Sequence, residues 1–328
     1  MRRIIFRGLI WALLLSNLTA RELGFQLTLK VVDDEGQPLP SVNVQVSFDN
    51  ENARKPSERV NSVNSLTDLK GRAQLDGKTA GAEIGFGAHK DGYYFVSGSS
   101  YQFSEAGLFK WQPWNPTIEV VLKRIRNPVP MYAKREERKI PDFGKPIGYD
   151  LMKSDWVAPY GKGEVSDVIF EANRKVQSAR EYDGTLALHF PNGGDGLIPL
   201  EVPQPDNGGL RMPYSAPEVG YLSTKTWQES RHTAEDGSIK LISSVSKTMN
   251  YFIRIRTVQD AQGNIVQALY GKIHGDIRWF IGTQAPKSGL AFTYYLNPDG
   301  TRNVEFDPKR NLLKSSKPYD PDYENLAP

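Results

Sequence analysis

The sequence contains no cysteine among its 328 residues. Disulfide bonds, thiolate metal sites, a cysteine nucleophile and c-type haem attachment are therefore all excluded. A bacterial lipoprotein anchor is excluded as well, because its acyl chains need a cysteine just after the signal. The chain must hold its fold by core packing alone, unlike the small disulfide-rich domains of the extracellular world.

Residue patterns that carry catalysis or hold metals are also missing. The four histidines form no His-x-His or His-Glu-x-x-His spacing, so we expect no metal site and no cofactor. The sequence has no Gly-x-Ser-x-Gly elbow and no phosphate-binding loop, and no residue is assigned a catalytic role. A carboxylate pair for glycoside hydrolysis stays open, because such a pair meets in space rather than in sequence.

Excess charge of one sign is confined to the start of the chain. The formal net charge is +3, and residues 1–20 contain Arg2, Arg3 and Arg7 but no acid. The rest of the chain is balanced, so electrostatic capture of nucleic acid is not expected.

Long apolar runs are absent after residue 20. Residues 1–7 are basic, 8–15 are apolar and 16–20 are small and polar, which is the order of a secretory signal peptide. We expect cleavage after Ala20, an extracytoplasmic location (periplasmic or secreted) and no stable membrane span afterwards. The apolar run is short for a bilayer, and an uncleaved anchor is the alternative.

What the chain does contain is β patterning. Its 29 Gly and 22 Pro are spread along the sequence, which suits many short strands joined by turns. Apolar residues alternate with polar ones over residues 25–31 and 42–46, whereas residues 50–65 are expected to be a long exposed loop. Further strands are predicted over residues 84–88, 118–122, 165–176, 185–190, 239–245, 251–256, 265–270, 290–296 and 302–306.

Turn motifs in the first half point to a known architecture. They are Asp34-Glu35-Gly36-Gln37-Pro38-Leu39 before the strand of Val42, Val44 and Val46, then Thr67-Asp68 through Gly71-Arg72, and Gly92-Tyr93. Residues 24–124 thereby resemble the transthyretin-like β-sandwich of carboxypeptidase regulatory-like and bacterial Ig-like modules. The resemblance implies a non-catalytic module that packs against a neighbour or binds a surface, and it carries no active site over.

The whole chain is predicted to be all-β, with two β-sandwich domains after the signal peptide. The proline-rich, basic residues 125–147 are expected to be a linker. Residues 148–313 are expected to form a larger second sandwich or jelly roll, and residues 314–328 a flexible tail. This second half looks like secreted bacterial proteins of unassigned function.

One group of residues is a candidate binding site. Trp111 and Trp114 lie in a proline-bearing loop, with Tyr101 nearby in the sequence. Exposed rings on such a loop stack on sugars or clamp a partner chain. The alternative is that both tryptophans fill the interface between the two halves, because large aromatic side chains are usually buried.

These observations predict an exported, non-catalytic binding or structural protein of the cell envelope or exterior. A polysaccharide, a surface or another envelope protein is the expected partner. Two alternatives stay open: a polysaccharide-active enzyme with its site in the second domain, and a subunit of an extracellular assembly. A groove that holds two carboxylates and aromatic rings would favour the enzyme.

Overall fold

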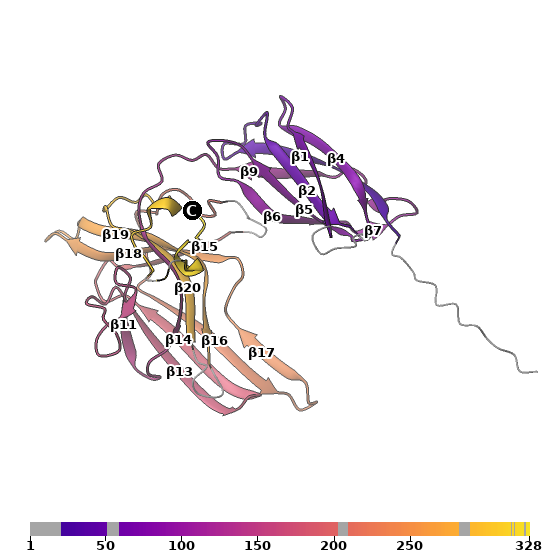
Figure 1. Cartoon of the computed structure of the whole chain (residues 1–328). Coiled ribbons are helices and arrows are strands. Elements are labelled where there is room, and N and C mark those ends of the chain that lie inside the picture. The colour runs from indigo at the N-terminus through magenta and orange to yellow at the C-terminus, as the bar shows by residue number, and fades with distance from the viewer. Residues whose placement is uncertain are drawn as a thin grey trace, which may run out of the picture. The chain divides into compact units, whose positions relative to one another are not determined.

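The computed structural model describes residues 21–50, 59–202, 209–281, 289–315, 317, 319–324 and 326–328, and most of them lie in β-strands or their turns (Figure 1). The prediction of an all-β fold is confirmed. The chain divides into two compact units, Met1–His89 with Gly98–Val120, and Lys90–Ser97 with Val121–Pro328. Within the described residues, no helix is long and apolar enough to cross a membrane. The expected signal peptide lies outside them.

The first unit is a sandwich of a three-stranded sheet, β4-β1-β9, and a four-stranded sheet, β3-β2-β5-β6. Alternate side chains of β1, among them Phe25, Leu27 and Leu29, are buried, as the sequence pattern predicts. Phe25 meets Phe48 of β2 with 5.0 Å between ring centroids, so the two sheets share one core. The strands are β1 (Leu23–Asp33), β2 (Asn43–Asp49), β3 (Val60–Leu66), β4 (Arg72–Thr79), β5 (Glu83–His89), β6 (Val96–Gln102), β7 (Glu105–Ala106), β8 (Trp111–Gln112) and β9 (Thr117–Leu122).

One kind of hairpin turn recurs in both units. An aspartate side chain accepts hydrogen bonds from the backbone N–H groups two and four residues later. The glycine three residues after the aspartate has positive φ. At Gly71 an added Cβ would lie 2.4 Å from the carbonyl oxygen of Val31, so the position needs glycine for space as well as for φ. The three turns begin at Asp33, Asp68 and Asp260.

The second unit is a larger sandwich. Its five-stranded sheet has the order β10-β20-β19-β18-β15, and its six-stranded sheet the order β12-β11-β13-β14-β16-β17. Side chains of both sheets form one core, in which Trp227 of β16 meets Tyr251 of β18 at 6.1 Å between ring centroids. The strands are β10 (Tyr132–Lys139), β11 (Pro146–Asp150), β12 (Asp155–Trp156), β13 (Val168–Ser178), β14 (Glu181–His189), β15 (Gly196–Glu201), β16 (Thr224–Thr233), β17 (Ile239–Ser243), β18 (Met249–Gln259), β19 (Ile265–Phe280) and β20 (Gly289–Asn297).

The expectation that residues 125–147 form a linker is corrected. The middle of this segment belongs to a sheet, because β10 pairs with β20 along its whole length, and its end enters β11, which begins at Pro146. Its charges neutralise one another: Lys134 and Arg138 both form ion pairs with the buried Glu136, at 3.0 and 2.8 Å. Burial opposes ionisation of Glu136, but a hydrogen bond from Tyr149 and these two cations outweigh it and lower the Glu136 pKa.

The ends assigned to the two domains also differ from the predicted boundaries. Lys90–Ser97 groups with the second unit, where the Tyr94 hydroxyl donates to Glu305 at 2.8 Å. In the segment expected to be a flexible tail, the short helix α1 (Pro321–Glu324) is followed by Leu326, which is buried against the outer face of the five-stranded sheet beside Tyr295 and Phe306. Whether the two units fold independently stays a prediction.

One buried ion pair joins the two sheets of the second unit. Arg256 of β18 donates through Nε and Nη2 to the two oxygens of Asp167, at 2.7 and 3.0 Å, and Nη2 lies 3.4 Å from Asp150 Oδ1. The Asp167 side chain is 0% exposed and that of Asp150 is 2% exposed. Because an isolated carboxylate at this depth is strongly disfavoured, Asp167 depends on the guanidinium, whereas Asp150 also accepts backbone N–H groups.

The backbone around this pair is held in an uncommon shape. Arg256 has a φ of 54°, in the left-handed region, at a bulge in β18. Asp195 accepts the backbone N–H groups of Arg256 and Thr257, at 3.1 and 2.8 Å, and so fixes the bulge. Burial raises the pKa of Asp167, whereas backbone donors outweigh burial at Asp150 and lower its pKa.

Replacement of Arg256 by Met should destabilise the protein by about 3–5 kcal/mol, because it leaves two buried carboxylates without a cation. The lower end is expected, since 28% of the arginine side chain is exposed. The defect should shrink as the pH falls toward about 4. Protonation removes the buried charge of Asp167, whose raised pKa makes its stability contribution fall as pH rises. Urea denaturation at several pH values measures this.

Arg278→Met is the matched control, because Arg278 lies exposed on β19 and should change stability by less than about 0.5 kcal/mol. Asp167→Asn in the Arg256→Met background should recover part of the loss. Equal stability of Arg256→Met and the control would contradict the role given to this ion pair.

Candidate functional site

The aromatic residues singled out in the sequence lie in the first unit and do not form one exposed platform. Trp111 is 8% exposed, its Nε1 donates to the carbonyl oxygen of Thr79 at 3.1 Å, and its ring stacks on Phe103. Tyr101 packs its edge against the same Phe103, with 5.2 Å between centroids. The expectation that Trp111 offers its ring to a ligand is therefore corrected, because the ring is part of the core of this unit.

Trp114 differs from Trp111. Its side chain is 41% exposed, and the ammonium group of Lys110 lies 4.7 Å from its ring centroid. The contacts of Trp111 with Thr79 and Phe103 lie within the first unit, so they do not support the alternative that the tryptophans fill an interface between the halves. Ligand binding by Trp114 stays a prediction.

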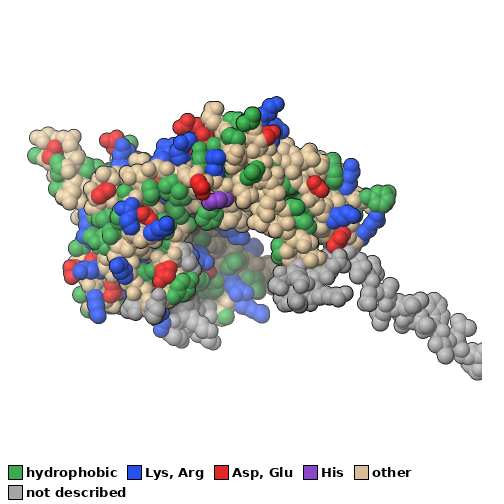
Figure 2. All heavy atoms as spheres, turned by 45° about the horizontal axis from the view of Figure 1, so that its top comes forward, with side chains coloured by type: hydrophobic (Ala, Val, Ile, Leu, Met, Phe, Trp, Pro, Cys, Tyr) green, Lys and Arg blue, Asp and Glu red, His purple; other side chains and the backbone are tan. Residues whose placement is uncertain are grey.

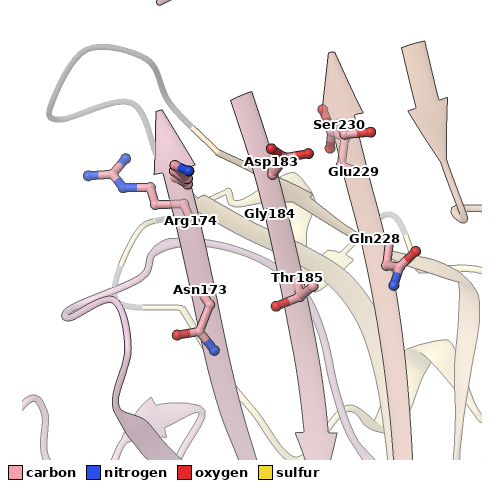
Figure 3. A pocket seen from close by; sticks show the side chains of 9 residues that line it. Asn173, Arg174, Asp183, Gly184, Thr185, Gln228, Glu229 and Ser230 are labelled. Atoms are coloured by element: carbon pink, nitrogen blue, oxygen red, sulfur yellow. The ribbon is translucent and has the colours of Figure 1, made fainter. Parts of the chain in front are cut away.

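An open groove of about 460 Å³ lies on the six-stranded sheet of the second unit (Figure 3). A Cβ on Gly184 would meet Cη2 of Trp279 at 2.4 Å, so Gly184 faces the core, and its neighbours Asp183 and Thr185 point to the outer face. Two cross-strand rows of polar side chains border the groove. They are Asn173, Thr185 and Gln228, and Lys175, Asp183 and Ser230, each row paired across β13, β14 and β16.

At one end of this groove, a histidine contacts two acidic side chains. His232 Nε2 lies 2.9 Å from Asp183 Oδ1, and Nδ1 lies 3.3 Å from Glu181 Oε2. The hydrogen bonds to Asp183 and Glu181 raise the pKa of the exposed imidazole. The lining is thus polar and nearly neutral, and it suits hydrogen bonding to an uncharged polar ligand.

The groove does not have the carboxylate geometry of a glycoside hydrolase. Glu229 is opposite Gly184 in the sheet register, so its side chain is directed to the core face, where the Tyr182 hydroxyl donates to it at 3.2 Å. Burial raises the pKa of Glu229. Asp183 is on the other face, and so the two carboxylates cannot flank one bond of a substrate. Among the residues that the structure describes, no group of acids and histidines is placed to hold a metal ion.

On the face that Figure 2 shows, charged side chains of one sign do not gather into an extended patch. Basic and acidic side chains are interspersed there, with apolar side chains between them.

The edge strand β17 is the second candidate surface. All five of its residues are exposed, and three of them are large aliphatics: Ile239 at 45%, Leu241 at 63% and Ile242 at 57%. It pairs with β16 on one side, and no other described strand lies against it. The sequence predicts this strand but not its exposure. The one sequence signal of that exposure is that apolar residues lie on both faces of the strand.

Hydrogen bonds fix which backbone groups of β17 are open. The Ser244 N–H donates to the Gln228 carbonyl at 3.0 Å, and the Ala234 N–H donates to the Ser238 carbonyl at 2.8 Å. Along an antiparallel strand, residues whose backbone groups bond the neighbouring strand alternate with residues whose backbone groups point away from it. These two bonds therefore show that the even-numbered residues of β17 direct their N–H and C=O groups to β16. The N–H and C=O groups of Ile239, Leu241 and Ser243 are therefore directed to the open edge.

The other edges of the second unit are shielded. β10 carries a run of charged side chains, β15 contains Pro199, and β12 has two residues. Charge, proline and short length are the common ways to prevent edge pairing. β17 has one lysine, Lys240, and no proline, so it is the least protected edge of this unit.

Comparisons with known proteins leave the family open. No protein-family model and no curated protein matches the chain. Among solved structures, chlorocatechol 1,2-dioxygenase from Pseudomonas putida is 12% identical, with a TM-score of 0.27, over 31% of this chain and 61% of its own. The match thus spans about three fifths of the dioxygenase's length.

Two pilins match over more of the chain. The major pilin subunit of Bacillus cereus is 12% identical over 86% of this chain and 99% of its own, with a TM-score of 0.22. The shaft pilin from Lactobacillus rhamnosus GG is 12% identical over 73% of this chain and 89% of its own, with a TM-score of 0.21. At these TM-scores the similarities assign no function to any residue.

Separate Ala substitutions distinguish the two tryptophans. Trp111→Ala should destabilise the protein by about 3–5 kcal/mol, because it removes a buried ring and leaves a cavity. Trp114→Ala, its matched control, should cost less than about 1 kcal/mol, the range of an exposed cation–π contact. Chemical denaturation of each variant measures this, and equal effects would contradict the different burial of the two rings.

Proposed function

We propose that the protein is a non-catalytic structural subunit of an extracytoplasmic assembly and that it joins a neighbouring chain by strand addition at β17. The observation that carries the proposal is the open edge of β17, with Ile239, Leu241 and Ser243 directing their backbone groups outward. In strand addition, main-chain hydrogen bonds supply affinity and alternate side chains supply specificity.

The side chains of β17 favour burial by such a partner. Ile239 and Leu241 lie on the core-facing side of the sheet, in register with Thr233 and Arg231 of β16, yet both remain exposed. A strand added beside β17 would remove these aliphatic groups from water, at about 25 cal/mol per Å² of apolar surface buried. The predicted signal peptide supports an extracytoplasmic location.

Hydrogen exchange tests strand addition directly. Amide protons of β17 should exchange more slowly in protein isolated from the cell envelope than in purified, dilute protein, because assembly would bond the outward N–H groups. Leu241→Pro should abolish this protection and keep the fold, since proline is tolerated on an edge strand where its N–H would face solvent.

Leu241→Thr is the control, because it keeps the backbone N–H and removes only apolar surface. It should retain partial protection, measured by mass spectrometry of β17 peptides. Equal exchange of β17 in the two preparations, with protection found at another edge, would overturn the proposal.

A second candidate function rests on the groove. Its amide and hydroxyl side chains suit the hydroxyl groups of a neutral polysaccharide, and three paired strands present them in rows. Affinity electrophoresis through gels containing dextran or galactomannan should retard the protein. The double variant Asn173→Ala with Gln228→Ala should lose the retardation, whereas Lys240→Ala outside the groove should keep it. Unchanged mobility of the wild-type protein in every gel would reject this function.

A further inference from the structure

We infer that the strand added at β17 is β17 of a second copy of this chain, antiparallel and centred on Leu241. This inference rests on the proposed strand addition and names its partner. In this register Leu241 faces Leu241 of the second copy, and Ile239 faces Ser243. Each of these pairs has its N–H and C=O groups directed at the partner, so each pair exchanges two hydrogen bonds.

The side chains are complementary in the same register. On the core-facing side, Ile239 and Leu241 of both copies form one aliphatic cluster, with the small Ser243 at each end. On the outer side, Ile242 lies opposite Lys240 of the other copy, so the two lysines are diagonal rather than directly opposed. Among two-fold pairings of this strand, the one centred on Leu241 gives hydrogen-bond partners to the backbone groups of all three residues that direct them to the open edge.

A two-fold axis perpendicular to the sheet generates this pairing. Such an axis keeps the two sheets on the same side, so the six-stranded sheets of both copies become continuous. The contact also closes on itself, which removes the open edge from both chains. A five-residue edge buries less than the roughly 800 Å² per partner of a standard stable interface. Association should therefore be weak in dilute solution and favoured where many copies are anchored or crowded together.

Cysteine cross-linking tests the register, because the natural chain has no cysteine to confuse the result. Opposed residues of a hydrogen-bonded pair have Cα atoms about 5.5 Å apart, which is within disulfide range. Leu241→Cys should form covalent dimers under mild oxidation. Val266→Cys is the matched control, because Val266 is 63% exposed, as Leu241 is, but lies on β19.

A mixed pair tests the direction of pairing. Ile239→Cys mixed with Ser243→Cys should cross-link between the two chains, whereas Ile239→Cys alone should stay monomeric on a non-reducing gel. At least a tenfold excess of dimer for Leu241→Cys over Val266→Cys is expected. Equal yields from these two variants would overturn self-pairing.

The two experiments separate the inference from the function on which it rests. Envelope-protected β17 amides together with no Leu241→Cys dimer would mean that an unlike chain supplies the strand, and the proposed function would stand. Unprotected amides together with no dimer would contradict both the self-pairing and the proposed strand addition. Circular dichroism of each cysteine variant, all at exposed positions, checks that the fold is kept.

Discussion

The bidentate pair between Arg256 and Asp167 is the contact on which the larger unit depends. It joins the two sheets at the end where β13 begins, and its second carboxylate, Asp150, accepts backbone N–H groups from Lys153 and Val165. Removal of the guanidinium would leave two carboxylates in the core and free the loop that they organise. Among the residues that the structure describes, no buried ion pair joins the two sheets at the opposite end of the six-stranded sheet, where β13 ends and the exposed β17 lies.

Local sequence signals predict much of this fold, because their causes are local. Alternation of apolar residues places β1, β2 and β18 correctly, since burial of one strand face needs only the period of the strand. The turns at Asp33, Asp68 and Asp260 follow from an aspartate that bonds the backbone and a glycine with positive φ.

The features that the sequence does not reveal depend on partners that are distant in sequence. β3 lies largely in residues expected to be a loop, and it is a strand because β2 offers it an edge. Trp111 appears in a turn-rich stretch, and only Phe103 and Thr79 reveal that its ring is buried. Lys272 is fully buried without a hydrogen-bond partner in the described structure, and burial lowers its pKa to about 7. Nothing in its neighbouring sequence indicates that environment.

The pairing of β10 with β20 has a consequence for how the chain folds. Tyr132 pairs with Leu296, so β10 is synthesised well before its partner strand. Contacts of such sequence separation form slowly, because the intervening chain must first be ordered. Until then β10 has no strand beside it. Its alternating lysines, glutamates and arginines keep that strand hydrated and repel misplaced partners during the delay. In the folded sheet, Lys134 and Arg138 form ion pairs with Glu136.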